Sequence, residues 1–121
     1  MANVSGIGGL FIRSHNPDAL AAWYKQHFGI GIGAIGEIWK QQAGPSVFAP
    51  FKEDSTYFRA DKRFMLNLRV TDIAAQIVDL EAAGVAVKRV DDETYGIFAH
   101  LEDLDGNPVE LWQPLSEQES I

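Results

Sequence analysis

The stretch that decides the fold is His100-Leu101-Glu102-Asp103-Leu104-Asp105-Gly106-Asn107-Pro108-Val109-Glu110-Leu111-Trp112-Gln113. Its centre, Asp105 to Pro108, is typical of a tight turn, because glycine accepts positive φ and proline fixes the exit direction. Apolar runs on both sides of the turn predict a β-hairpin. In the second strand Val109 and Leu111 alternate with Glu110 and Trp112, so one face is apolar and the other carries a carboxylate. That carboxylate is either a solvated group at the rim of the sheet or part of a site.

Composition limits the classes of partner. The 121 residues predict one domain, and 17 acidic against 10 basic residues give a net charge of −7. This charge disfavours nucleic acid and anionic membranes, whereas a cationic or neutral ligand remains compatible with it. The absence of cysteine excludes disulfides, thiolate zinc sites and thiol nucleophiles. No stretch has the pattern of a signal peptide or a transmembrane helix, so we expect a cytoplasmic protein.

The first half of the chain predicts one helix among several strands. Asn16 is a helix cap, Pro17 occupies the first helical position, and Gly29 ends the helix. The glycine-rich run at 30–36 lacks the helix start of a phosphate-binding loop and is interpreted as a bent strand. The expected strands are Ile7 to Arg13, Glu37 to Gln41, Ser46 to Phe51, and Ser55 to Arg59.

The second half repeats this plan. A helix capped by Thr71 or Asp72 and closed by Gly84 follows a strand, and its apolar stripe is Ile73, Ile77 and Leu80. The expected strands are Phe64 to Val70, Val85 to Val90, Gly96 to Glu102, and Val109 to Gln113. The pattern is therefore a β-α-β-β-β unit repeated after roughly 55 residues. One helix cannot cover a sheet and also close its edges, so the two halves must pack together, within one chain or between two.

The repeat, the Asn16-Pro17-Asp18 helix start and the motif from Asp105 to Trp112 together resemble the vicinal oxygen chelate superfamily of glyoxalase I, extradiol dioxygenases and bleomycin-resistance proteins. The resemblance implies an α+β fold over residues 1–121, with modules at 5–60 and 63–114. The two modules would form a curved eight-stranded mixed sheet around a concave cavity, with the helices on its outer face. Members of the superfamily often complete the cavity at a dimer interface, so we expect a homodimer.

The same resemblance also allows a test for metal. Metal-dependent members place ligands on the first and last strand of each module. The corresponding positions here are Gly9 or its neighbour, the strand at 55–58, Met65 and Glu110, and only Glu110 is a ligand. One carboxylate cannot hold a divalent ion that needs several donors. We therefore expect no metal and no cofactor.

Strand alternation predicts which side chains share the face of Glu110. The expected ligand-binding residues are aromatic or polar, a mixture typical of small-molecule pockets; they are Glu110, Trp112, Trp39, Arg69, His100, Phe11, Phe98 and Asn67. Each also has a structural alternative. Phe11 and Phe98 could be core residues, Arg69 could pair with Glu110, and His100 could be structural or carry a proton. His15 and His27, at the two ends of the first helix, are expected to face solvent or cap.

Two functional classes follow. The first is a metal-independent protein that holds a small aromatic or cationic molecule, in the manner of bleomycin-resistance proteins. The second is an enzyme of the superfamily, either a lyase, isomerase or dioxygenase with a divalent metal or a metal-free variant that uses Glu110 and His100 as acid and base. Because one fold hosts both classes, the fold cannot decide between them.

Overall fold

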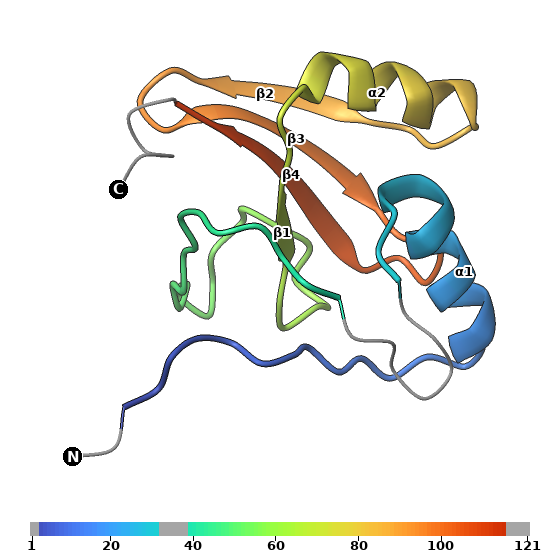
Figure 1. The fold of residues 1–121 in the computed structure, drawn as a ribbon, viewed down its shortest axis with the longest axis horizontal. Helices are drawn as coiled ribbons and strands as arrows, with labels where there is room; N and C mark the ends of the chain where they lie inside the picture. The colour runs from blue at the N-terminus through green and yellow to red at the C-terminus, as the bar shows by residue number, and fades with distance from the viewer. Residues whose placement is uncertain (1–2, 32–38, 116–121) are drawn as a thin grey trace.

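The structure, a computed structural model, describes residues 3–31 and 39–115. These residues form an α+β fold with two helices and four strands, as predicted for the class. Along the chain the elements are α1 (Pro17–Phe28), β1 (Leu66–Arg69), α2 (Ile73–Ala82), β2 (Lys88–Asp92), β3 (Gly96–Glu102) and β4 (Pro108–Pro114) (Figure 1). Neither of the two described helices is long and apolar enough to cross a membrane.

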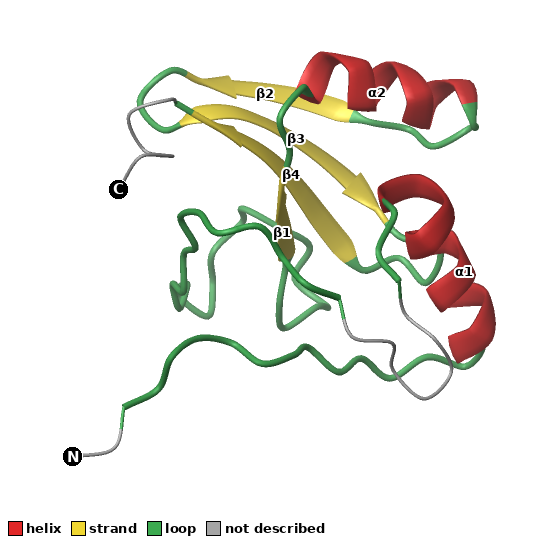
Figure 2. Cartoon of the chain, in the orientation of Figure 1, coloured by secondary structure: helices red, strands yellow, loops and turns green. Residues whose placement is uncertain are grey.

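The sheet is mixed and has the strand order β1-β4-β3-β2 (Figure 2). β3 and β4 form the predicted antiparallel hairpin, and β1 pairs with β4 in parallel. The hairpin turn contains Gly106 at a φ of 80°, a conformation that glycine adopts without the steric cost of a Cβ. β4 therefore lies between two neighbours, which makes it the central strand together with β3.

The helix ends confirm the sequence signals. The Asn16 side chain accepts a hydrogen bond from the Ala19 amide at 3.2 Å, and Gly29 ends α1 in the left-handed conformation. The Asp72 side chain caps α2 by accepting from the Ala75 amide at 3.1 Å. These caps depend only on residues close in sequence, so both helices begin within one residue of the expected position.

The hydrophobic core lies between the helices and one face of the sheet (Figure 1). Val109 and Leu111 of β4 are its centre and are at most 1% exposed. The other buried residues of the cluster come from both helices, the segment just after α1, and strands β1 and β3: Leu20, Tyr24, Ile30, Leu68, Ile73, Leu80, Ala99 and Leu101. The opposite face of the sheet is left free of helices and faces the irregular segments of the first half (Figure 1).

A buried polar contact attaches α1 to the hairpin turn. The Tyr24 hydroxyl donates to Asp103 Oδ2 at 2.7 Å. Asp103 also accepts from the amides of Asp105 and Asn107, both at 2.9 Å. One carboxylate thus organises the turn and holds the helix of the first half against the sheet of the second half.

The predicted strands of the first half do not form. Residues 3–31 and 39–65 contain no strand. The expected strands that are missing there are Ile7 to Arg13, Ser46 to Phe51 and Ser55 to Arg59, together with residues 39–41 of the strand expected from Glu37 to Gln41. The glycine-rich prediction at 32–36, with 37–38, lies outside the described residues. The described sheet therefore has four strands in place of the expected eight. A strand needs a hydrogen-bonding neighbour, and the described residues of the single chain provide none for these segments.

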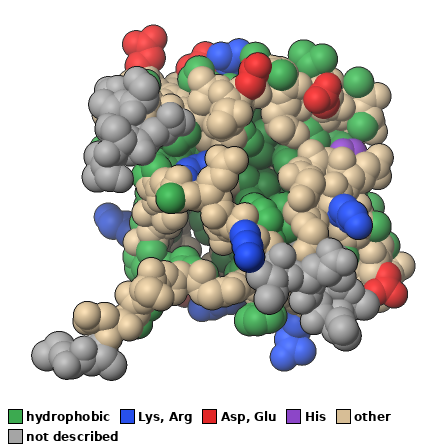
Figure 3. Space-filling model, viewed as in Figure 1, with side chains coloured by type: hydrophobic (Ala, Val, Ile, Leu, Met, Phe, Trp, Pro, Cys, Tyr) green, Lys and Arg blue, Asp and Glu red, His purple; other side chains and the backbone are tan. Residues whose placement is uncertain are grey.

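The absence of these strands leaves apolar side chains at the surface. Phe11 is 96% exposed and Phe48 is 84% exposed. Hydrophobic side chains lie open in the middle of the face shown in Figure 3. In the second half the strands do form, with β1 shorter than expected and β2 shifted toward Asp92.

Candidate functional site

Strand register brings polar side chains together on the helix-free face. Asn67 of β1 lies opposite Glu110 of β4, and Glu110 lies opposite His100 of β3. Two residues further along the same face, Arg69 lies opposite Trp112, and Trp112 lies opposite Phe98. Because side chains alternate between faces, these six residues form two adjacent rows on one side of the sheet.

Three donors surround the Glu110 carboxylate, which is 5% exposed. Asn67 Nδ2 donates to Oε1 at 2.7 Å. His100 Nε2 lies 2.7 Å from Oε2, and the Tyr57 hydroxyl donates to the same oxygen at 2.5 Å. A buried carboxylate needs such partners, because an unpaired buried charge is strongly destabilising.

The protonation states follow from these contacts. Burial raises the pKa of Glu110, but donation from His100, Tyr57 and Asn67 outweighs it, so this pKa lies below its usual range. Burial, and then the bond to Glu110, raise the pKa of Tyr57 well above the ordinary phenol value. At neutral pH Glu110 is therefore an anion and Tyr57 a neutral donor.

An aromatic wall adjoins the polar row. The rings of Phe98 and Trp112 lie nearly parallel, with 3° between their planes and 6.2 Å between centroids. Trp112 is 6% exposed, and its indole Nε1 donates to the Tyr95 carbonyl at 2.8 Å. Because the hydrogen bond fixes the indole, the wall is positioned before any ligand arrives.

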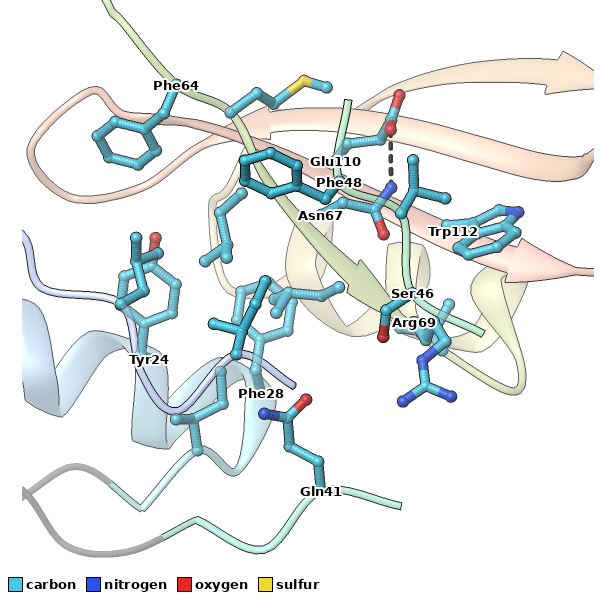
Figure 4. A pocket seen from close by; sticks show the side chains of 18 of the residues that line it. Tyr24, Phe28, Gln41, Ser46, Phe48, Phe64, Asn67, Arg69, Glu110 and Trp112 are labelled. Carbon is cyan, nitrogen blue, oxygen red and sulfur yellow. Dashed lines mark hydrogen bonds between the residues drawn. The ribbon is translucent and has the colours of Figure 1, made fainter. Parts of the chain in front are cut away.

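A large open hollow lies between this face and the irregular segments of the first half. Glu110, Trp112 and Asn67 of the sheet line it, and so does Phe48 of the first half, which lies near Glu110 in Figure 4. At its rim Arg69 does not pair with Glu110, which was one alternative from the sequence. Its Nη2 donates to the Gln42 carbonyl at 2.9 Å, and so it attaches the segment near residue 42 to β1.

The predicted site residues divide into two groups. Six of them come together on one face, as strand alternation predicts: Asn67, Arg69, Phe98, His100, Glu110 and Trp112. Trp39 (45% exposed) and Phe11 (96% exposed) line the hollow but belong to segments that form no strand.

The sequence analysis missed Tyr57. It lies in an expected strand that does not form, so alternation gave no information about its direction. The only sequence signal for a role of Tyr57 at the site was its position in a stretch rich in aromatic residues.

The two remaining histidines lie outside the site. His15 is exposed before α1. His27 is in the last turn of α1, where its ring contacts that of Trp23 at 4.8 Å. The capping role expected for His27 stays a prediction.

The residues at the site do not fit a metal ion of the kind used by metal-dependent relatives. Glu110 and His100 already bond to each other, and two further donors occupy the carboxylate. Across the described part of the chain, no three histidine, aspartate or glutamate side chains gather closely enough to hold a metal ion. The donor set therefore satisfies the carboxylate without a cation.

Comparison with known proteins adds the family. The profile of the glyoxalase-like domain matches residues 9–112. No curated protein matches the chain. Among solved structures, TnmS3, an antibiotic binding protein from Streptomyces sp. CB03234, has a TM-score of 0.61 at 23% identity and covers 95% of this chain and 100% of that one.

Two further structures are similar to the chain. A glyoxylase/bleomycin resistance protein/dioxygenase domain from Frankia sp. EAN1pec has a TM-score of 0.54 at 14% identity, covering 93% of this chain and 100% of that one. A glyoxalase/bleomycin resistance protein from Streptomyces sp. CB03234 is 38% identical, but the match covers 40% of this chain and 42% of that one, with a TM-score of 0.37. Because the family profile spans most of the sequence, the chain belongs to the glyoxalase-like domain family of the vicinal oxygen chelate superfamily.

Proposed function

We propose that this protein is a metal-independent binding protein that holds a small aromatic or cationic molecule against the helix-free face of its sheet. The observation that carries the proposal is the buried Glu110 anion next to the parallel rings of Phe98 and Trp112. An aromatic wall with a few oriented polar groups is the usual composition of a small-molecule site. An anion beside aromatic faces also favours a cationic guest.

The relationship to solved structures supports the same class. TnmS3, whose fold this chain shares, is an antibiotic binding protein. The negative net charge of −7 adds long-range attraction for cations.

Tryptophan fluorescence tests the proposal, because Trp112 is part of the wall. Protein treated with a chelator is expected to bind members of a panel of aromatic cations, and Phe98→Leu is expected to weaken that binding by about 3- to 10-fold, since an aromatic pair contributes about 0.5–1.5 kcal/mol. Val78→Leu, at an exposed position on α2, is a control away from this face. Panel members that bind parent and Phe98→Leu equally would contradict the proposed site.

The second candidate is an enzyme of the superfamily, and the contact between His100 and Glu110 favours it, because a carboxylate can orient an imidazole for proton transfer. Elemental analysis of the purified protein separates the metal-dependent form of this candidate. Near-stoichiometric zinc, nickel, iron or manganese would overturn the metal-independent proposal.

We extend the proposal to the assembly of the protein. Modules 5–60 and 63–114 would pair between two copies, so that segments of the first half complete an eight-stranded sheet and close the cavity. The exposed apolar side chains of the first half, Phe11 and Phe48 among them, support this arrangement. So do the edge strands β1 and β2, each paired on one side only within the described residues.

Light scattering tests the assembly. A solution mass of twice 13.4 kDa is expected at micromolar concentration. Phe48→Glu should lower this mass, whereas Val78→Glu, at a 66% exposed position on α2, should not. A parent protein with the mass of one chain would contradict the dimer.

A further inference from the structure

The Glu110 carboxylate determines the hydrogen-bonding direction of its neighbours. An ionised carboxylate has only acceptor positions, so whatever group faces it must donate. The Asn67 amide must therefore turn its Nδ2 toward Glu110, and its Oδ1 must point away. A neutral His100 must likewise carry its proton on Nε2, which leaves Nδ1 as an acceptor.

Asn67 presents this acceptor to the open hollow. The side chain is exposed, and Oδ1 lies on the side away from Glu110 (Figure 4). No other described residue donates a hydrogen bond to it. Glu110 itself has about four acceptor positions, of which three are used, and the remaining one is on Oε1 beside Asn67.

The neighbouring row has the opposite character. Arg69 is the next residue on the same face of β1, and its guanidinium has five donors, of which one bond goes to the Gln42 carbonyl. Arg69 shares its row with the aromatic wall, because Trp112 lies opposite Arg69 and Phe98 lies opposite Trp112. The hollow thus offers a hydrogen-bond acceptor at Asn67 and hydrogen-bond donors at Arg69.

We propose that Asn67 is a specificity-determining residue that selects ligands with an N–H or O–H donor group, such as an amidine or amine on an aromatic frame, while Arg69 takes an acceptor group of the same ligand. This inference rests on the proposed binding function and adds the polarity of the ligand to it. It differs from a general preference for cations, because it assigns each end of the ligand to one residue.

Paired variants test the assignment with two probes, benzamidinium and benzoate. Asn67→Leu removes the acceptor without changing the net charge. It is expected to lower the affinity for benzamidinium about 3- to 10-fold, which is the usual contribution of one hydrogen bond. The affinity for benzoate should change by less than about twofold. Arg69→Met should lower the affinity for benzoate and leave the affinity for benzamidinium nearly unchanged. The inference would be overturned if Asn67→Leu lowered the affinities for both probes equally, or lowered neither.

A measurement without ligand separates this inference from the binding function. In ¹⁵N NMR spectra, a neutral His100 is expected as the Nε2–H tautomer, because Nε2 faces Glu110. His100→Gln identifies its signals. A His100 found as the Nδ1–H tautomer would overturn the inference even if both probes bind. The expected tautomer with no binding of either probe would instead reject the proposed function, and the inference with it.

Discussion

The two halves of this chain carry the same pattern of sequence signals and reach different structures. In the second half, residues 66–114, every predicted strand pairs with a neighbour. The helix-free face of this sheet holds the buried Glu110 anion. In the described residues up to 65, α1 is the only regular element. That helix is bonded to the second half through Tyr24 and Asp103. The irregular segments are bonded to it by side-chain contacts, such as Tyr57 with Glu110 and Gln42 with Arg69.

The difference shows what each element requires. A helix satisfies its backbone within itself, and two caps with an apolar stripe are enough to position it once it has a surface to pack on. A strand satisfies its backbone only with a neighbour. The halves therefore differ in available partners more than in local sequence, which is why a second copy is the proposed partner.

The largest expected effect contrasts a core side chain with an exposed one. Leu111→Ala removes a side chain with 0% exposure from the central strand and should lower the free energy of unfolding by about 2–5 kcal/mol. Phe48→Ala should change it by less than about 0.5 kcal/mol in dilute solution. Chemical denaturation measures both. A cost for Phe48→Ala that appears only at high protein concentration would show that a second copy covers this residue.

The contact between the halves comes next. Tyr24→Phe deletes the hydroxyl that bonds to the buried Asp103, and the expected loss is about 1.5–3 kcal/mol because the acceptor is charged. Tyr95→Phe is the matched control, since Tyr95 is 57% exposed. If thermal melts of the two variants coincide, the bond from Tyr24 to Asp103 does not help to hold α1 against the sheet.

Glycines give a smaller contrast. Gly106→Ala places a Cβ at a φ of 80°, where it also approaches Arg59 Nη1 at 3.1 Å, and should cost about 1–2 kcal/mol. Gly8→Ala meets nothing within 4 Å and should be neutral within about 0.5 kcal/mol. Equal melting temperatures for Gly106→Ala and the parent protein would show that the hairpin turn differs from the one described.

The smallest expected effect is the acid response of the second half. Because the folded pKa of Glu110 lies below its ordinary value of 4.5, its contribution to stability is complete above that pH and is lost as the pH falls toward the folded pKa. The parent protein should lose at most about 1.4 kcal/mol per pH unit through this group. In Glu110→Gln this part of the dependence of stability on pH should be missing, whereas Glu53→Gln should retain it. Denaturation at several acidic pH values measures this dependence. Identical slopes for the parent and Glu110→Gln would contradict the role of Glu110.

Local signals determined the helices, the last hairpin and the side of each strand in the second half. The caps at Asn16 and Asp72 and the turn at Gly106 each act over a few residues, so the sequence contains all the information they need. Alternation then placed Asn67, His100 and Glu110 on one face, because the period of a strand is fixed by its backbone. The family followed from the same motifs.

Only the tertiary structure decided which strands exist and how the site is bonded. Strands of the first half depend on partners that no local pattern specifies, and Tyr57 reaches Glu110 across 53 positions of sequence. Arg69 had an acid within reach by alternation, yet it bonds to the Gln42 carbonyl. Periodicity fixes the face of a side chain, whereas its partner depends on how distant segments pack, and that is a property of the whole folded chain.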